Sequence, residues 1–449
     1  MALVGLFIAA FVVYRALGWA LGAPFMTPDS LVYLEMAKAP LAHMGGHHPA
    51  AFPWAIYVGE SFGAGPEWVI AAISAAKFTL VYSLLRKVYH SRLAAVPALL
   101  FCLWPEMLAL DFAAWSESGF IMTVVAISCV LAGSMTPFRT GVCCIALFTL
   151  LAEFRHAAIF FLPGAAIALV AYSWGHAGPV KRKWRLGAKW ALAWGTSLAS
   201  AWMLLNVART GHPLIPSRAK FECAHFLAAY NGLPFCRDIP DNLVCATDPE
   251  RRIVNNPATD ATFYIFSPEG PVRKIGQSEK LCDSWQEIKR VLVTKHPIET
   301  VALIGRRVME QFGEWTSPER GAGLYPIQLV GVNNWFDRRL LASASTHYLV
   351  PLSLVAACIA FWCGGWPLRP LLLFLVVGSA GHAIGIAINN PFLAMRYLFI
   401  HKAFICLAGL SSIPAIFSWA VGARRNKGPS LVLSTDGQAS PPVLQESQP

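Results

Sequence analysis

A carboxylate and two histidines follow the first apolar run of the chain. Asp29 lies a few residues after that run, and His47 and His48 come next. Asp29 fits the role of a helix N-cap, which is common for aspartate. It also fits a chemical role, because a carboxylate held at a membrane surface can act as a general base or orient a polar substrate. No third metal ligand is near the histidines in sequence, so we expect no metal site there.

The residues after Asp29 have the period of an amphipathic helix. Leu31, Leu34 and Ala37 recur at helical spacing, with Tyr33 between them. Such a helix would lie in the membrane interface and keep Asp29 at the surface. Tyr33 is then expected to be an interfacial anchor rather than a catalytic group.

Composition indicates a membrane protein. Of the 449 residues, 56% are hydrophobic and 14% are charged, and the mean hydropathy is +0.50. These values exclude an ordinary soluble domain. The formal net charge is +11, but the basic residues fall mostly in short loops between apolar runs, as the positive-inside rule requires, so no nucleic-acid partner is expected.

Apolar runs predict an all-α polytopic protein with about ten transmembrane helices. The first run has no basic segment before it, so we expect a retained span rather than a cleaved signal peptide. The run at 140–153 is short, which allows a broken or re-entrant helix. The ten predicted spans are 2–23, 67–85, 93–112, 118–134, 140–153, 157–174, 188–206, 345–363, 369–388 and 398–420.

Lysines and arginines collect in alternate connections, which predicts one cytoplasmic side that carries both termini. The loops at 24–66 and 207–344 are then external. Four cysteines share the longer loop, and an even set there indicates an oxidising compartment with two disulfides, for which three connectivities are open. These cysteines are Cys223, Cys236, Cys245 and Cys282.

This topology divides the chain into four parts. Residues 1–206 form a transmembrane module with a catalytic first loop at 24–66, and 207–344 form an external loop domain. Residues 345–423 are the last transmembrane helices, and 424–449 are a polar, disordered cytoplasmic tail. Helical spacing around Trp285, and again after Pro297, makes the loop domain partly helical, so that it could close over a membrane-facing site.

Six short motifs occur in an order that resembles the GT-C superfamily of membrane glycosyltransferases, which includes protein mannosyltransferases and lipid A aminoarabinose transferases. The resemblance spans nearly the whole chain. The motifs are Pro28-Asp29-Ser30, His47-His48-Pro49, Trp115-Ser116-Glu117-Ser118, Phe154-Arg155-His156, the stretch from Trp285 to His296-Pro297, and Met395-Arg396-Tyr397.

The resemblance implies transfer of a sugar from a polyprenyl-phosphate donor to a glycan, lipid or protein acceptor, with inversion if it is a single displacement. Asp29 would be the acid that activates the acceptor. Many relatives have a second acidic residue beside it, where this chain has Ser30. Glu35 or Glu117 could take that role. His48 would lie near the donor phosphate.

An anionic leaving phosphate calls for arginine, which binds it through two nitrogens. Arg155 and Arg396 lie at the external ends of predicted spans, where they break the positive-inside pattern. We therefore assign them to the donor phosphate, with Tyr397 beside Arg396. Snorkelling to the interface is the alternative for each arginine. Arginines can offset the charge of a monophosphate, so this chemistry requires no metal and no cofactor.

Two other functions remain open. A transporter or lipid flippase would have an internal repeat or paired half-helices, and the sequence has neither. An O-antigen ligase or polymerase would not need the acid after the first span. Arg15 and Lys77 lie within predicted spans and should face protein, a cavity or an interface rather than lipid. The expected location is the bacterial cytoplasmic membrane, with the catalytic site on its external face.

Overall fold

The computed structural model describes residues 2–24, 28–40, 49–175, 233–248, 267–276, 279–313, 348–366, 368–389 and 395–425, with isolated positions between 189 and 230. Helices dominate these residues, and no β-strand occurs among them. The structure therefore confirms an all-α polytopic membrane protein.

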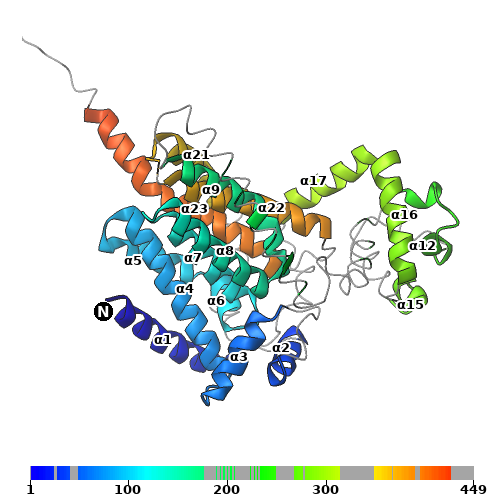
Figure 1. The fold of residues 1–449 in the computed structure, drawn as a ribbon, viewed down its shortest axis with the longest axis horizontal. Helices are drawn as coiled ribbons and strands as arrows, with labels where there is room; N and C mark the ends of the chain where they lie inside the picture. Colours follow the sequence, from blue (N-terminus) through cyan, green and yellow to red (C-terminus); the bar gives the residue numbers. More distant parts are fainter. Residues whose placement is uncertain are drawn as a thin grey trace, which may run out of the picture.

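Apolar helices form one bundle, and a second group of helices forms a separate unit that α17 joins to it (Figure 1). The bundle helices are α1 (Ala2–Leu21), α4 (Pro66–Tyr89), α5 (Ala95–Cys102), α6 (Pro105–Phe112), α7 (Glu117–Leu131), α8 (Pro137–Phe154), α9 (Leu162–Gly175), α21 (Val350–Cys363), α22 (Leu368–Asn389) and α23 (Met395–Arg425). Beside the bundle lie α2 (Pro28–Lys38) and α3 (Ala51–Ser61), and short 3-10 turns precede α5 (η1, Arg92–Ala94) and α9 (η2, His156–Phe161). The separate unit holds η3 (Phe235–Arg237), α12 (Leu243–Ala246), α15 (Pro271–Ile275) and α16 (Glu279–Lys295), and α17 spans Pro297–Gly313.

Local sequence explains the ends of α4. Pro66 occupies the first turn, where its missing N–H is not needed, and Glu67 adds a negative charge at the amino end. Arg86 and Lys87 lie in the last turn, and His90 closes the helix in a left-handed conformation. With 24 residues, α4 is about 36 Å long at 1.5 Å per residue, enough to cross a bilayer core.

Six described helices are long and apolar enough to cross a membrane, and three shorter apolar helices accompany them. These nine coincide with nine of the predicted runs. The tenth, 188–206, lies mostly outside the described residues, although its isolated described positions are helical.

Two predicted spans differ from the structure. The run at 93–112 is not continuous, because α5 ends at Cys102 and α6 begins at Pro105. Proline cannot donate the helical hydrogen bond and pushes the preceding residue out of the helical region, and Trp104 is indeed extended with ψ 135°. The run at 140–153 is not broken, since α8 is a single helix of 18 residues.

Candidate active site

Helix α2 is fastened to the start of α7 by one buried hydrogen bond. The Tyr33 hydroxyl and Ser116 Oγ are 3.2 Å apart, and the Tyr33 ring meets Phe52 edge to face. Tyr33 is therefore buried in protein, and the prediction that it anchors the chain in the lipid interface is wrong. Asp29 belongs to α2, four residues before Tyr33, and its side chain lies outside the described part of the structure.

Glu117 and Arg155 form an ion pair at the same end of the bundle. Arg155 Nη1 donates to Glu117 Oε1 at 2.6 Å, and the side chains are 11% and 4% exposed respectively. Glu117 is the first residue of α7, where a carboxylate complements the helix dipole. Arg155 is the residue at which α8 ends, in extended conformation. We call this end, where α7 begins and α8 and α22 finish, the site end of the bundle.

Glycines on α22 allow the turn after Arg155 to pack closely. A Cβ at Gly381 would lie 2.2 Å from the Phe160 carbonyl oxygen, and one at Gly385 would lie 2.1 Å from the Phe160 ring. Any larger residue at these positions would push η2 away from α22. The glycines of α22 thus set the position of η2, and with it the position of Arg155 directly before η2.

His382 is a buried imidazole next to this packing contact. Its ring lies 6.2 Å from the Phe120 ring and 5.6 Å from the Phe161 ring, and the charge of Arg155 acts on it. Neither ring nitrogen has a hydrogen-bond partner among the described residues, which is unusual for a buried polar group. The sequence contains a signal for it, since His382 is the sole ionisable residue between Arg369 and Arg396.

A second buried charge pair lies within the bundle. Lys77 Nζ on α4 donates to Asp111 Oδ1 on α6, and both side chains are completely buried. Ser118 Oγ donates to the same carboxylate oxygen at 2.5 Å, one residue after Glu117. Lys77 therefore faces protein, as its position within a span predicted, whereas Asp111 was not singled out. The carboxylate ties α4 to the turn that carries Glu117.

The remaining predicted site residues are distributed as follows. Glu35 is exposed and bonds to Lys38 at 2.6 Å. Arg396 and Tyr397 belong to the first turn of α23, and their side chains, like the whole of His48, lie outside the described residues. Within the described ranges, no cluster of three or more histidine, cysteine or acidic side chains could hold a metal ion.

The separate unit is held together by two disulfides and a small core. Cys223 is joined to Cys282, and Cys236 to Cys245. The core is formed mainly by one face of α16, including Trp285, Ile288 and Leu292; its other buried residues include Leu227, Phe235 and Val244. This α16 face has the helical spacing noted in the sequence.

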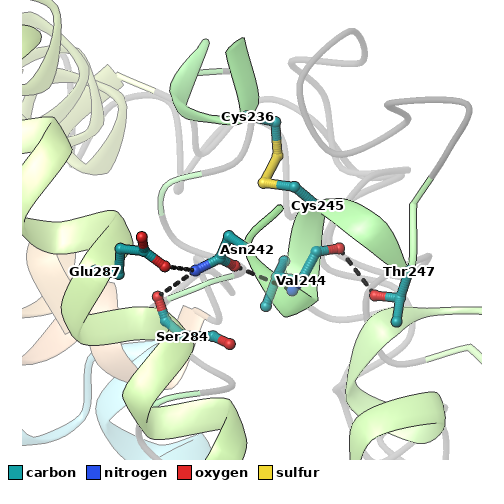
Figure 2. The surroundings of a disulfide bond; sticks show 7 residues. All are labelled: Cys236, Asn242, Val244, Cys245, Thr247, Ser284 and Glu287. Carbon is teal, nitrogen blue, oxygen red and sulfur yellow. Dashed lines mark hydrogen bonds between the residues drawn. A yellow bond between two sulfur atoms is a disulfide. The ribbon is translucent and has the colours of Figure 1, made fainter. Parts of the chain in front are cut away.

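Figure 2 shows how Asn242 connects the short helix α12 to α16 near the second disulfide. Its Nδ2 donates to the Ser284 carbonyl at 3.2 Å and to Glu287 Oε2 at 2.6 Å. Its Oδ1 accepts from the Val244 N–H at 3.0 Å and so caps α12. The buried Asn242 side chain therefore hydrogen-bonds both α12 and α16.

An acidic residue of this unit binds the end of α16. Asp238 accepts hydrogen bonds from Lys295 at 2.9 Å and from His296 at 2.7 Å. Two hydrogen bonds lower the pKa of Asp238 below its usual value. The one from Lys295 has the larger effect, and the one from His296 follows it. The carboxylate is thus kept ionised at the junction between α16 and α17.

Comparison with models of known protein families gives no match, and comparison with curated proteins gives none either. Among solved structures, the chain is similar to the archaeal oligosaccharyltransferase AglB from Archaeoglobus fulgidus, in complex with an inhibitory peptide and a dolichol-phosphate. The identity is 13% and the TM-score is 0.42, with 97% of this chain and 52% of that protein covered. The chain thus spans about half the length of AglB.

Proposed function

We propose that this protein is a membrane glycosyltransferase of the GT-C type. It transfers a sugar from a polyprenyl-phosphate donor to a glycan, lipid or protein acceptor at the external face of a bacterial cytoplasmic membrane. One observation carries the proposal: the helix that bears Asp29 is bonded through Tyr33 to Ser116, directly before the Glu117–Arg155 pair. The helix that bears Asp29 and the Glu117–Arg155 pair thus lie at one end of an apolar bundle.

The proposed reaction is a single displacement. The acceptor oxygen or nitrogen attacks the anomeric carbon, and the bond between that carbon and the phosphate oxygen breaks. The bonding electrons leave with the polyprenyl phosphate, and the acceptor proton passes to the Asp29 carboxylate. The guanidinium of Arg155 stabilises the negative charge that develops on the phosphate.

Glu117 holds Arg155 in this scheme, because the two side chains are hydrogen-bonded and almost buried. A guanidinium has five N–H donors, and the bond to Glu117 engages one of its nitrogens. We also assign Arg396 to the donor phosphate, from its place at the external end of a predicted span, with Tyr397 beside it. His48 is assigned there on the sequence resemblance. The four disulfide-bonded cysteines belong to the external unit, which we propose covers the site and selects the acceptor.

The proposal is tested with purified protein in nanodiscs, a panel of polyprenyl-phosphate sugars and candidate acceptors. We compare wild type with Asp29→Asn, and use Glu60→Gln as the matched control because Glu60 is an exposed acid on α3 that has no part in the scheme. Wild type and the control should release polyprenyl phosphate, whereas Asp29→Asn should bind the donor without turning it over. An Asp29→Asn variant with wild-type turnover would remove Asp29 from the mechanism.

If wild type moves a polyprenyl-phosphate sugar across a liposome membrane but never cleaves it, the protein is a flippase and the transferase proposal is wrong. Fluorescent donor in one leaflet, followed by a membrane-impermeant quencher, measures that movement. The two assays together separate transfer from transport.

A further inference from the structure

Helix α17 carries an apolar stripe on its outer face. Ile298, Val301 and Met309 are 81%, 68% and 70% exposed. Ala302 and Gly305 are exposed between them. The spacings of three, four and seven residues put these positions on one face of the helix. The stripe therefore runs along most of the length of α17.

The opposite face of α17 is already packed. Leu303 and Ile304 lie against the core of the separate unit. Further along, Gln311 Nε2 donates to the Ala383 carbonyl at 2.8 Å, and Arg307 Nη1 donates to the Ala387 carbonyl at 3.4 Å. Since the inner face makes these contacts with the protein, the outer apolar residues belong neither to the core of the bundle nor to the core of the separate unit.

These two hydrogen bonds fix the height of α17 relative to the membrane. Ala383 and Ala387 lie in the last turns of the apolar span of α22. The Ala387 carbonyl would bond residue 391, which is a proline without an N–H, so Arg307 supplies the missing donor. Figure 1 shows α17 leaving this end of α22 across the general direction of the bundle. The carboxyl end of α17 is thus held at the level of the last turns of α22, and the rest of the helix extends sideways from there.

The lipid-facing surface of the bundle continues onto α17. Ile384 lies between the two anchoring carbonyls of α22 and is exposed. Arg306 is exposed next to the stripe, and Lys295 is exposed just before the helix. An apolar stripe beside cationic side chains is the pattern of a helix that lies in a bilayer interface, with its cations among anionic headgroups.

From these contacts we infer that α17 is an interfacial helix whose Ile298–Val301–Met309 face inserts into the lipid leaflet at the site end of the bundle. The occupant of this face is the bilayer, including its anionic lipids. Lipid contact thereby anchors the separate unit next to the bundle. The inference does not depend on glycosyl transfer, and its tests do not measure activity.

The first test places the photoreactive residue p-benzoylphenylalanine at Val301, in nanodiscs of phosphatidylcholine and phosphatidylglycerol. A control protein carries the same residue at Lys289, which is exposed on α16. On irradiation the benzophenone inserts into a nearby C–H bond, and mass spectrometry detects an added lipid. For a lipid-embedded face, we expect the adduct at Val301 to exceed the control at least about tenfold. Equal yields at the two positions would overturn the inference.

The second test avoids a bulky side chain. Lys289→Met creates a protein with two comparable exposed methionines, at position 289 on α16 and at Met309 on α17. Hydroxyl radicals generated in water oxidise accessible methionine to sulfoxide, and peptide mass spectrometry reports both rates in one sample. We expect Met309 to be oxidised several-fold more slowly in nanodiscs. Equal rates refute lipid burial, and protection of Met309 without a lipid adduct at Val301 means that protein covers the face instead, which also overturns the inference.

Discussion

Removing the charge of Glu117 should strongly destabilise the protein. Glu117→Gln keeps the side-chain shape but leaves Arg155, 11% exposed, without its carboxylate at 2.6 Å. An uncompensated buried charge costs about 3–5 kcal/mol. Two unit charges about 4 Å apart interact by about 4 kcal/mol at an effective dielectric constant of about 20, which agrees with that range. Because Arg155 keeps some access to water, we expect a loss near the lower end, about 3 kcal/mol.

The double variant Glu117→Gln/Arg155→Met decides whether the loss comes from the pair. Removing both charges leaves neither member of this pair as an unpartnered ion, so the neutral double variant should recover most of the stability that either single variant loses. Unfolding of all four proteins in nanodiscs, followed by heat or denaturant, completes the double-mutant cycle. The explanation fails if the two single losses add in the double variant within about 0.5 kcal/mol, or if Glu117→Gln unfolds like wild type.

Three further changes test other parts of the structure. Gly381→Ala would put its Cβ 2.2 Å from the Phe160 carbonyl oxygen, so it should cost about 1–3 kcal/mol and displace the turn after Arg155; an unchanged melting temperature would contradict this packing. Cys223→Ser removes a bridge to Cys282 across a sequence separation of 59, which chain entropy puts at about 4 kcal/mol for the separate unit; denaturant unfolding of the oxidised proteins measures the loss, and equal midpoints would show that the bridge contributes nothing. Asp238 has a lowered pKa, so the stability it adds is present above the ordinary carboxyl pKa and is lost as the pH falls through its own lowered value; Asp238→Asn should weaken the acid dependence of unfolding, and superimposable acid-unfolding curves would refute that role.

Much of the fold follows from local sequence, because membrane spans must be apolar and must satisfy their own backbone. The ends of α4 can be deduced from Pro66 and Glu67 at the start and from Arg86 and Lys87 at the end. The interruption before Pro105 is also a local effect, and the sequence analysis missed it by treating an apolar run as one helix. Periodicity predicted the helices α16 and α17. It could not show that the apolar face of α16, which includes Trp285, is buried, whereas Val301 on α17 is exposed.

The candidate site depends on contacts between distant parts of the chain. Charges at span ends singled out Glu117 and Arg155 separately, but their ion pair depends on how closely η2 packs on α22, which small residues such as Gly381 permit. The partner of Lys77 could not be read from spacing, since Asp111 lies at the end of a different predicted span. The prediction that Tyr33 lies in the lipid interface was wrong for a similar reason. An amphipathic pattern shows that one face of a helix is apolar, but it does not show whether protein or lipid covers that face.

The buried Lys77–Asp111 pair has a consequence for how the chain enters the membrane during synthesis. Lys77 lies at the middle of α4, where a lone lysine raises the free energy of insertion by about 2.5–3.5 kcal/mol. Its counter-charge is synthesised 34 residues later, so α4 leaves the ribosome before it can be neutralised. Until α6 follows, the other apolar residues of α4 must offset this cost alone. A chain truncated before Asp111 should therefore hold α4 in the membrane less stably than the full chain does.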